Sequence, residues 1–252
     1  MAVHMYLGTN AHKNIIITYL QLLGLCSCVA VRKPWICIIN RPKRLRFAKR
    51  HFKILPGHLS KIVRTDESSF QAFGHRGQQR IWRHPGDRYT SKFVVPTVKH
   101  GGSSLLVWGM MTRFGVGPIY GVDGSMWQDQ YLHVLENALL PHVKNKVGSN
   151  FSFQQDNAPC HASSLVKEWF QSNDMTPWSW PPQSPDLSPI ENLWRDISMG
   201  LKQSKPINLH ELLSEIQRIW YAIPVERCQW LVDSFPRRIK ACISSLGSHT
   251  KC

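Results

Sequence analysis

The sequence predicts an α/β fold in which a mixed β-sheet carries helices on both faces. Short apolar stretches of strand type come first in the larger part of the chain, then alternate with segments of helical periodicity, and finally give way to helices. That order is typical of a mixed sheet packed between helical layers. The chain has 252 residues, of which 42% are hydrophobic, so it can bury the core of one large domain with a small appendage.

The first 57 residues are predicted to be organised differently from the rest. Residues 15–25 predict a short apolar helix that ends at Gly24. The segment 41–51, RPKRLRFAKRH, is basic with a thin apolar stripe. It is interpreted either as a solvated helix face or as a phosphate-contacting linker or nuclear import signal.

An uncharged run of 18 residues lies between Lys13 and Arg32. Its length is at the lower edge of a membrane span, and its end resembles a signal-peptide cleavage region. Polar residues within the run and the basic stretch that follows argue against both interpretations. We therefore expect no membrane partner.

From about residue 58 the pattern of strands and helices is regular. Residues 83–102 form a basic, irregular loop, and a glycine turn at 114–117 precedes 118–124. Strands are expected at 61–73, 78–84, 103–112, 151–156 and 175–180. Helices are expected at 126–144, 163–173, 190–201, 208–222 and 225–246.

The charge balance and the cysteines indicate the class of partner. The chain has 31 basic against 16 acidic residues, a formal net charge of +15, which favours binding to a polyanion such as nucleic acid. The seven cysteines are scattered and contain no CxxC pair, so neither a zinc site nor a disulfide framework is favoured. We expect reduced, mostly buried thiols in an intracellular protein.

Three carboxylates are the candidate catalytic and metal-binding residues: Asp66, Asp156 and Glu191. Asp66 and Asp156 lie in or after predicted strands, and Glu191 begins a helix 34 residues beyond Asp156. Carboxylates from distant elements suit Mg²⁺ or Mn²⁺, which prefer oxygen ligands, and two such ions catalyse phosphodiester displacement. Converging carboxylates would otherwise repel one another.

Each carboxylate also has a structural alternative. Asp66 could be solvated at a strand edge, and Asp156 could begin an Asx turn. Glu191 could complete a capping box that starts at Ser188. Three other acidic residues remain possible members of the site: Asp123, Glu136 and Asp186.

From about Leu45 onward, the chain resembles the catalytic part of Tc/mariner superfamily DNA transposases, in their Tc-type branch. The motifs that carry the resemblance are TDESSF, WRHPGDRY, VPTVKHGGSSLLVWG, GVGPIYGVDG, FQQDNAPCHAS and WPPQSPDLSPIENLW. The resemblance extends through KPINLHELLSEIQRIWYAIP and LVDSFPRRIKACISSLG.

The resemblance implies an RNase H-like fold and cut-and-paste transposition in the nucleus. It places the family's DDE triad on Asp66, Asp156 and Glu191, with two Mg²⁺ or Mn²⁺ ions as cofactors. Hydrolysis at the element end then frees a 3′ hydroxyl that attacks target DNA at a TA dinucleotide. The partners implied are double-stranded DNA and a second copy of the chain, with dimer and DNA contacts from the loop at about 76–100.

The N-terminal region departs from the family pattern, which has two helix-turn-helix modules before the catalytic domain. Here only ITYLQLLGLCSCVAVRKPW is similar to the end of the second module, and residues 18–31 lack basic side chains. We therefore predict a truncated helix-turn-helix remnant with a basic linker at 1–57 and a catalytic domain at 58–252. An alternative is a non-catalytic, DNA-binding remnant of a transposable element. The predicted DNA contacts are Arg32, Lys33, Arg41, Lys43, Arg44, Arg46, Arg83 and Arg88.

Overall fold

The computed structural model describes residues 12–27, 35–72, 104–147, 151–204 and 206–250. The chain divides into two compact units, Met1–Pro34 and Trp35–Cys252. In the first unit the described helix is α2 (Lys13–Leu22), which agrees with the apolar helix expected near Gly24. Within the described residues, no helix combines the length and apolar character that crossing a bilayer requires.

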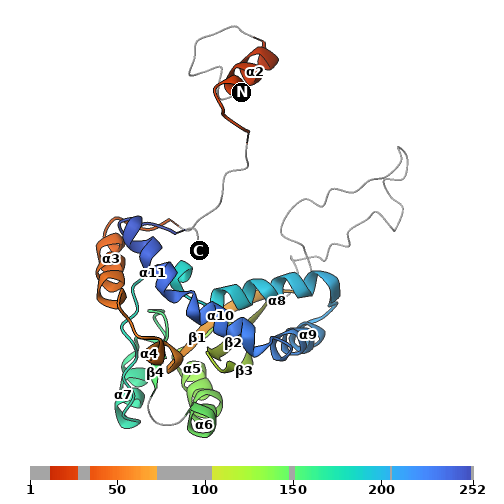
Figure 1. Cartoon of the computed structure of the whole chain (residues 1–252). Coiled ribbons are helices and arrows are strands. Elements are labelled where there is room, and N and C mark those ends of the chain that lie inside the picture. The colour runs from red at the N-terminus through yellow and green to blue at the C-terminus, as the bar shows by residue number, and fades with distance from the viewer. Residues whose placement is uncertain (1–11, 28–34, 73–103, 148–150, 205, 251–252) are drawn as a thin grey trace. The chain divides into compact units, whose positions relative to one another are not determined.

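A four-stranded mixed sheet forms the centre of the second unit (Figure 1). The strands lie in the spatial order β3-β2-β1-β4, with only β1 and β4 parallel. Their bounds are β1 (Ile62–Gln71), β2 (Ser104–Thr112), β3 (Gly115–Val122) and β4 (Ser152–Gln154). The expected α/β fold with a mixed sheet is thereby confirmed.

Two strand predictions have other outcomes. The strand expected at 78–84 lies outside the described residues. The strand expected at 175–180 is wrong, because this segment forms only one isolated parallel bridge, between Phe153 and Pro177. The hydrogen bond that Trp178 N donates to the Phe153 carbonyl belongs to this bridge.

Helices cover both faces of the sheet. On one face lie α5 (Gln128–Val134), the π-helical η3 (Leu135–Leu139), α6 (Leu140–His142), the π-helical η4 (Val143–Val147) and α7 (Ser164–Ser172). On the other lie α8 (Ile190–Ser204), α9 (Leu209–Tyr221), α10 (Val225–Asp233) and α11 (Phe235–Ser244), with α3 (Asn40–His51) packed on α11. Two short helices, α4 (Pro56–Ser60) and the 3₁₀ turn η5 (Pro185–Leu187), lie in connections.

The single helix expected at 225–246 is two helices. Chain direction changes at Ser234, between α10 and α11. Pro236 occupies the start of α11, where its missing N–H does no harm, whereas it would break the interior of a longer helix.

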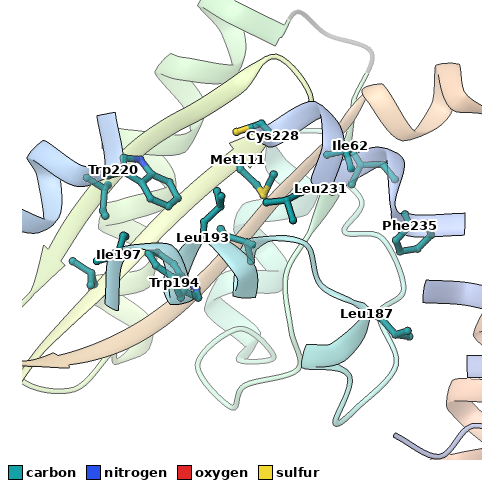
Figure 2. Packing of buried hydrophobic residues seen from close by; sticks show 14 of the residues in the cluster. Ile62, Met111, Leu187, Leu193, Trp194, Ile197, Trp220, Cys228, Leu231 and Phe235 are labelled. Carbon is teal, nitrogen blue, oxygen red and sulfur yellow. The ribbon is translucent and has the colours of Figure 1, made fainter. Parts of the chain in front are cut away.

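Alternate residues of the strands point to opposite faces of the sheet and belong to two separate hydrophobic cores. Trp108 and Phe153 point to the α5–α7 side, whereas Val107 and Met111 point to the α8–α11 side. In the second core, the Trp194 and Trp220 rings stack with centroids 5.2 Å apart (Figure 2). Below them, a Cβ at Gly109 would lie 2.6 Å from the Trp194 ring, so only glycine leaves room for it.

The basic segment 41–51 lies within the second compact unit, which begins at Trp35. It folds as α3, whose Phe47 and Ala48 are buried in the same core as α8–α11. The apolar stripe that the sequence showed in this charge run is therefore a packing surface.

Candidate active site

The three predicted carboxylates line one pocket of about 370 Å³. Asp66 belongs to β1, Asp156 follows β4 by two residues, and Glu191 lies in the first turn of α8. The parallel register of β1 and β4 places Arg64 opposite Gln154. Asp66 and Asp156 each lie two residues beyond this pair, in the two adjacent segments of the chain. The opposite wall of the pocket is the segment 180–185.

Burial and neighbouring negative charges raise the pKa of two of the three carboxylates. Burial, and then the charges of Glu191, Glu67 and Asp156, raise the pKa of Asp66 well above its usual range. Burial and the charge of Asp156 raise the pKa of Glu191. Such a cluster holds several negative charges only at a cost, which a bound cation relieves.

Asp66 is oriented by the core on the α8 side of the sheet. Its Oδ2 accepts a hydrogen bond of 3.2 Å from the indole Nε1 of Trp194. Trp194 is in turn held between Trp220 and the bare backbone of Gly109. Buried packing thus fixes the orientation of this carboxylate, which lines the pocket.

Glu67 points to the opposite face, as the alternation of a strand requires, and meets His161 there. His161 Nε2 lies 3.3 Å from Glu67 Oε1, and its Nδ1 lies 2.7 Å from Asp156 Oδ1. Burial alone would lower the pKa of His161, but the two carboxylates outweigh it and raise the pKa to about 10. The imidazolium therefore bridges the two sides of the sheet edge.

The same bridge acts on Asp156. Burial would raise the pKa of Asp156, but contact with His161 and a hydrogen bond of 2.9 Å from Ala158 N lower it below its usual value. The latter bond is the Asx turn considered as an alternative for Asp156, so one carboxylate makes the turn and also faces the pocket.

Ligand atoms of Glu67, Asp156 and His161 lie within 4.8 Å of one another and are geometrically able to hold a metal. The raised pKa of His161 favours its protonated form, which makes ion pairs with both carboxylates. Sequence reasoning did not find His161. The available signal was a histidine in the turn directly after Asp156.

The other candidate acids do not join the pocket as ligands. Asp123 and Glu136 are exposed and do not line it. Asp186 binds Arg44 through both carboxylate oxygens, at 2.7 and 2.8 Å. The capping box considered for Glu191 would start at Ser188. α8 begins at Ile190, two residues after Ser188, and Ser188 Oγ accepts a hydrogen bond of 3.5 Å from Gln154 Nε2.

The predicted DNA contacts have mixed outcomes. On α3, Lys43 and Arg46 are exposed and Arg41 is half-buried. Arg44 is fully buried and paired with Asp186, so the expectation that it contacts DNA is wrong. Its guanidinium has no access to a phosphate. The remaining predicted contacts, Arg32, Lys33, Arg83 and Arg88, and the loop at 76–100 lie outside the described residues.

Comparisons with known proteins identify the family that the chain resembles. Residues 61–213 match a family model described as a DDE superfamily endonuclease. The transposable element Tc1 transposase of Caenorhabditis elegans is 39% identical over 232 residues, covering 92% of this chain and 85% of the relative. The Tcb1 transposase of Caenorhabditis briggsae is 38% identical with the same coverage.

Solved structures share the fold. A Mos1 mariner paired-end complex with Mn matches with a TM-score of 0.79 at 16% identity, covering 96% of this chain and 72% of that chain. The catalytic domain of Mos1 mariner transposase matches with a TM-score of 0.65 at 16% identity, covering 88% of this chain and all of that one. The likeness confirms the expected RNase H-like architecture.

Proposed function

Because this chain belongs to the Tc/mariner superfamily of DNA transposases, we propose that Asp66, Asp156 and Glu191 are its catalytic metal ligands. It is a DDE-type enzyme of cut-and-paste transposition that acts on DNA and depends on a divalent metal ion. The observation that carries the assignment of residues is one pocket that all three carboxylates line. Burial, and after it the charges of neighbouring carboxylates, raise the pKa of Asp66 and of Glu191.

The donor set fits Mg²⁺ or Mn²⁺, since carboxylate oxygens are the ligands these ions prefer. When two ions are bound, they supply Lewis-acid stabilisation of the attacking and leaving oxygens in an in-line phosphodiester displacement. The chain contributes orientation: Trp194 holds Asp66, His161 holds Asp156, and the start of α8 presents Glu191.

The remaining features of the function follow the family. The substrates are transposon ends and TA target sites in double-stranded DNA, and the reaction takes place in the nucleus with two copies of the chain acting together. Residues 1–57 contain a helix-turn-helix remnant, and exposed Lys43 and Arg46 on α3 contact phosphates.

The test is the substitution Asp156→Ala in the full chain, with Asp123→Ala as the matched control. Asp156→Ala removes a ligand, so Mn²⁺-dependent cleavage of DNA carrying transposon ends is abolished while DNA binding remains largely intact. Asp123 is exposed and outside the pocket, so its variant cleaves like the wild type. We expect calorimetric titration with Mn²⁺ to show two ions bound by the wild type and fewer bound by Asp156→Ala.

Equal metal-dependent cleavage by the wild type and Asp156→Ala would mean that these carboxylates are not the site. A wild-type chain that binds DNA and Mn²⁺ but never cleaves would instead favour the alternative of a non-catalytic remnant.

A further inference from the structure

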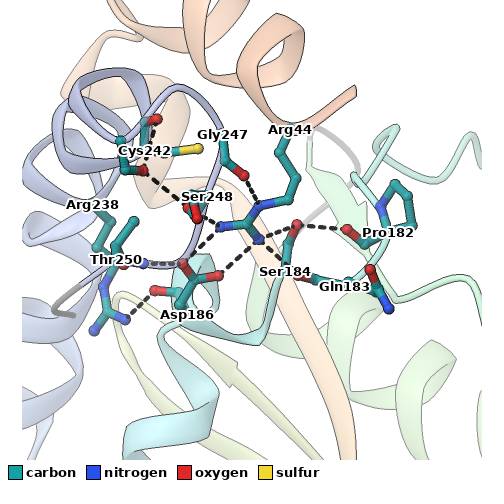
Figure 3. A network of polar contacts seen from close by, with 11 residues as sticks. Arg44, Pro182, Gln183, Ser184, Asp186, Arg238, Cys242, Gly247, Ser248 and Thr250 are labelled. Carbon is teal, nitrogen blue, oxygen red and sulfur yellow. Dashed lines mark hydrogen bonds and ion pairs between the residues drawn. The ribbon is translucent and has the colours of Figure 1, made fainter. Parts of the chain in front are cut away.

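Arg44 is a charged side chain of α3 that is completely buried, whereas Lys43, Arg46, Lys49 and Arg50 of the same helix are exposed. An arginine has five N–H donors in a fixed fork, and here every guanidinium nitrogen is engaged. Nε donates to Gly247 O at 2.9 Å, NH1 donates to Gln183 O, Ser184 Oγ and Asp186 Oδ1 at 2.7–2.8 Å, and NH2 donates to Asp186 Oδ2 at 2.7 Å and Ser248 O at 3.3 Å (Figure 3).

Two of the groups that accept hydrogen bonds from Arg44, Gln183 O and Ser184 Oγ, belong to the wall of the acidic pocket. Gln183 and Ser184 line the pocket together with the three carboxylates. Gln183 has a φ of 52°, a left-handed conformation that a side chain disfavours and that needs outside support. Support comes from the region of α3, because Gln183 Oε1 also accepts from Cys37 N at 2.9 Å and from Asn40 Nδ2 at 3.0 Å.

Asp186 extends this support toward Glu191. Its Oδ2 also accepts from Thr250 N at 3.0 Å, and its carbonyl accepts from Arg238 NH1 at 3.1 Å. Arg238 in α11 reaches Asn192 Oδ1 at 2.6 Å with its NH2 group. Asn192 is the residue after Glu191, so the network continues into the first turn of α8.

The C-terminal part of the network approaches α3 as closely as the backbone permits. Gly247 has a φ of 80°, and a Cβ on it would collide with the carbonyl oxygen of Arg41. Backbone atoms cannot move aside as a side chain can. The turn at 247–250 is therefore shaped to fit against α3 and to supply acceptors for Arg44.

We propose that Arg44 is a positioning residue of the transposase, which sets the loop 181–187 and through it the start of α8 that carries Glu191. α3 and the turn at 247–250 both lie outside the matched family region 61–213, so the site depends on chain segments at both ends of the unit. The proposal rests on the proposed function of the acidic pocket and deepens it.

Arg44→Lys is the test variant and Arg50→Lys its matched control. Lysine keeps the charge but offers three donors without the planar fork, so it cannot satisfy the same acceptors. Arg50 is exposed on the same helix, and its variant makes the same chemical change. The measurements on the full chain are DNA affinity, single-turnover cleavage as a function of Mn²⁺ concentration, and amide exchange of the non-proline residues of 181–191.

For Arg44→Lys we expect faster amide exchange in 181–191. Cleavage or Mn²⁺ affinity falls about 10- to 100-fold, as for other residues that hold metal ligands in place. DNA affinity changes less than about twofold, because the net charge is unchanged. Arg50→Lys leaves exchange and Mn²⁺ dependence as in the wild type.

Ser184→Ala tests the same contact if Arg44→Lys does not fold, because it removes one acceptor of Arg44 together with the hydrogen bond that Ser184 Oγ donates to the Pro182 carbonyl. A smaller shift in the same direction supports the proposal. Unchanged Mn²⁺ dependence in every folded variant of Arg44 or Ser184, or an equal loss in Arg50→Lys, overturns it. Cleavage that persists in Asp156→Ala contradicts the proposed function instead, so the two failures are distinguishable.

Discussion

Replacing Arg64 with methionine should stabilise the protein. Arg64 lies in β1 with none of its surface exposed, and its NH1 donates to the carbonyl of Ile62 at 3.0 Å. Among the described residues, nothing pairs with its Nε or NH2. Burial and then the charge of Arg238 lower the pKa of Arg64 to about 9, which shows how poorly the fold accommodates the cation.

The magnitude follows from the unpaired nitrogens. A buried polar group without a partner costs about 1–3 kcal/mol, and two such nitrogens therefore cost about 2–6 kcal/mol. The substitution loses one hydrogen bond, worth about 1 kcal/mol, and methionine fills much of the same volume. A net gain of about 1–5 kcal/mol remains, close to the range of about 1–4 kcal/mol found when buried ionic groups are replaced by apolar ones.

Equilibrium unfolding in urea measures this gain. With a slope of about 1–3 kcal/mol/M, a gain of 2 kcal/mol raises the midpoint by about 1 M. Arg46→Met is the control, because Arg46 is exposed and its change should stay within about 0.5 kcal/mol. A lower midpoint for Arg64→Met, or the same shift in both variants, would refute the reasoning and show that the guanidinium is favourably solvated.

Two further predictions concern the floor of the site and the DNA contacts. Gly109→Ala forces a methyl group onto the rigid Trp194 ring, so it should lower the free energy of unfolding in urea by about 1–3 kcal/mol and reduce cleavage activity. Gly117→Ala brings a methyl group against the flexible end of a methionine and should lower the stability less. Equal losses in the two variants would contradict the packing argument. Replacing Lys43 and Arg46 with alanine should lower the log–log salt slope of DNA binding by about 1–2, measured by titration, and an unchanged slope would show that α3 does not contact phosphates.

The sequence predicted the elements whose pattern is local. The apolar stripe of Ile190, Leu193, Trp194 and Ile197 predicted α8, and these residues are buried. The charge run of α3 was ambiguous, because nothing local distinguishes buried Arg44 from exposed Arg46. The difference is Asp186, which lies 142 residues away and enters only with the tertiary fold.

Other features were predictable in part. Pro236 marked the break between α10 and α11, since proline favours the start of a helix over its interior. The pairing of His161 with Glu67 and Asp156 was not predictable from spacing, because it joins two faces of the sheet at its edge. The acidic cluster itself was predicted from strand ends and a helix start, and the pocket contains all three of its members.

The contacts of Arg44 also bear on the order in which the protein folds. Arg44 and Gly247 are separated by 203 residues, and Arg44 and Asp186 by 142. Closing loops of this length costs chain entropy, so such contacts form late in folding, after the local helices and hairpins. An intermediate with the sheet and α8–α10 already packed would still lack a fixed loop at 181–187. We therefore expect the acidic pocket to be among the last parts of the unit to take shape, so that its completion reports that the whole unit has folded.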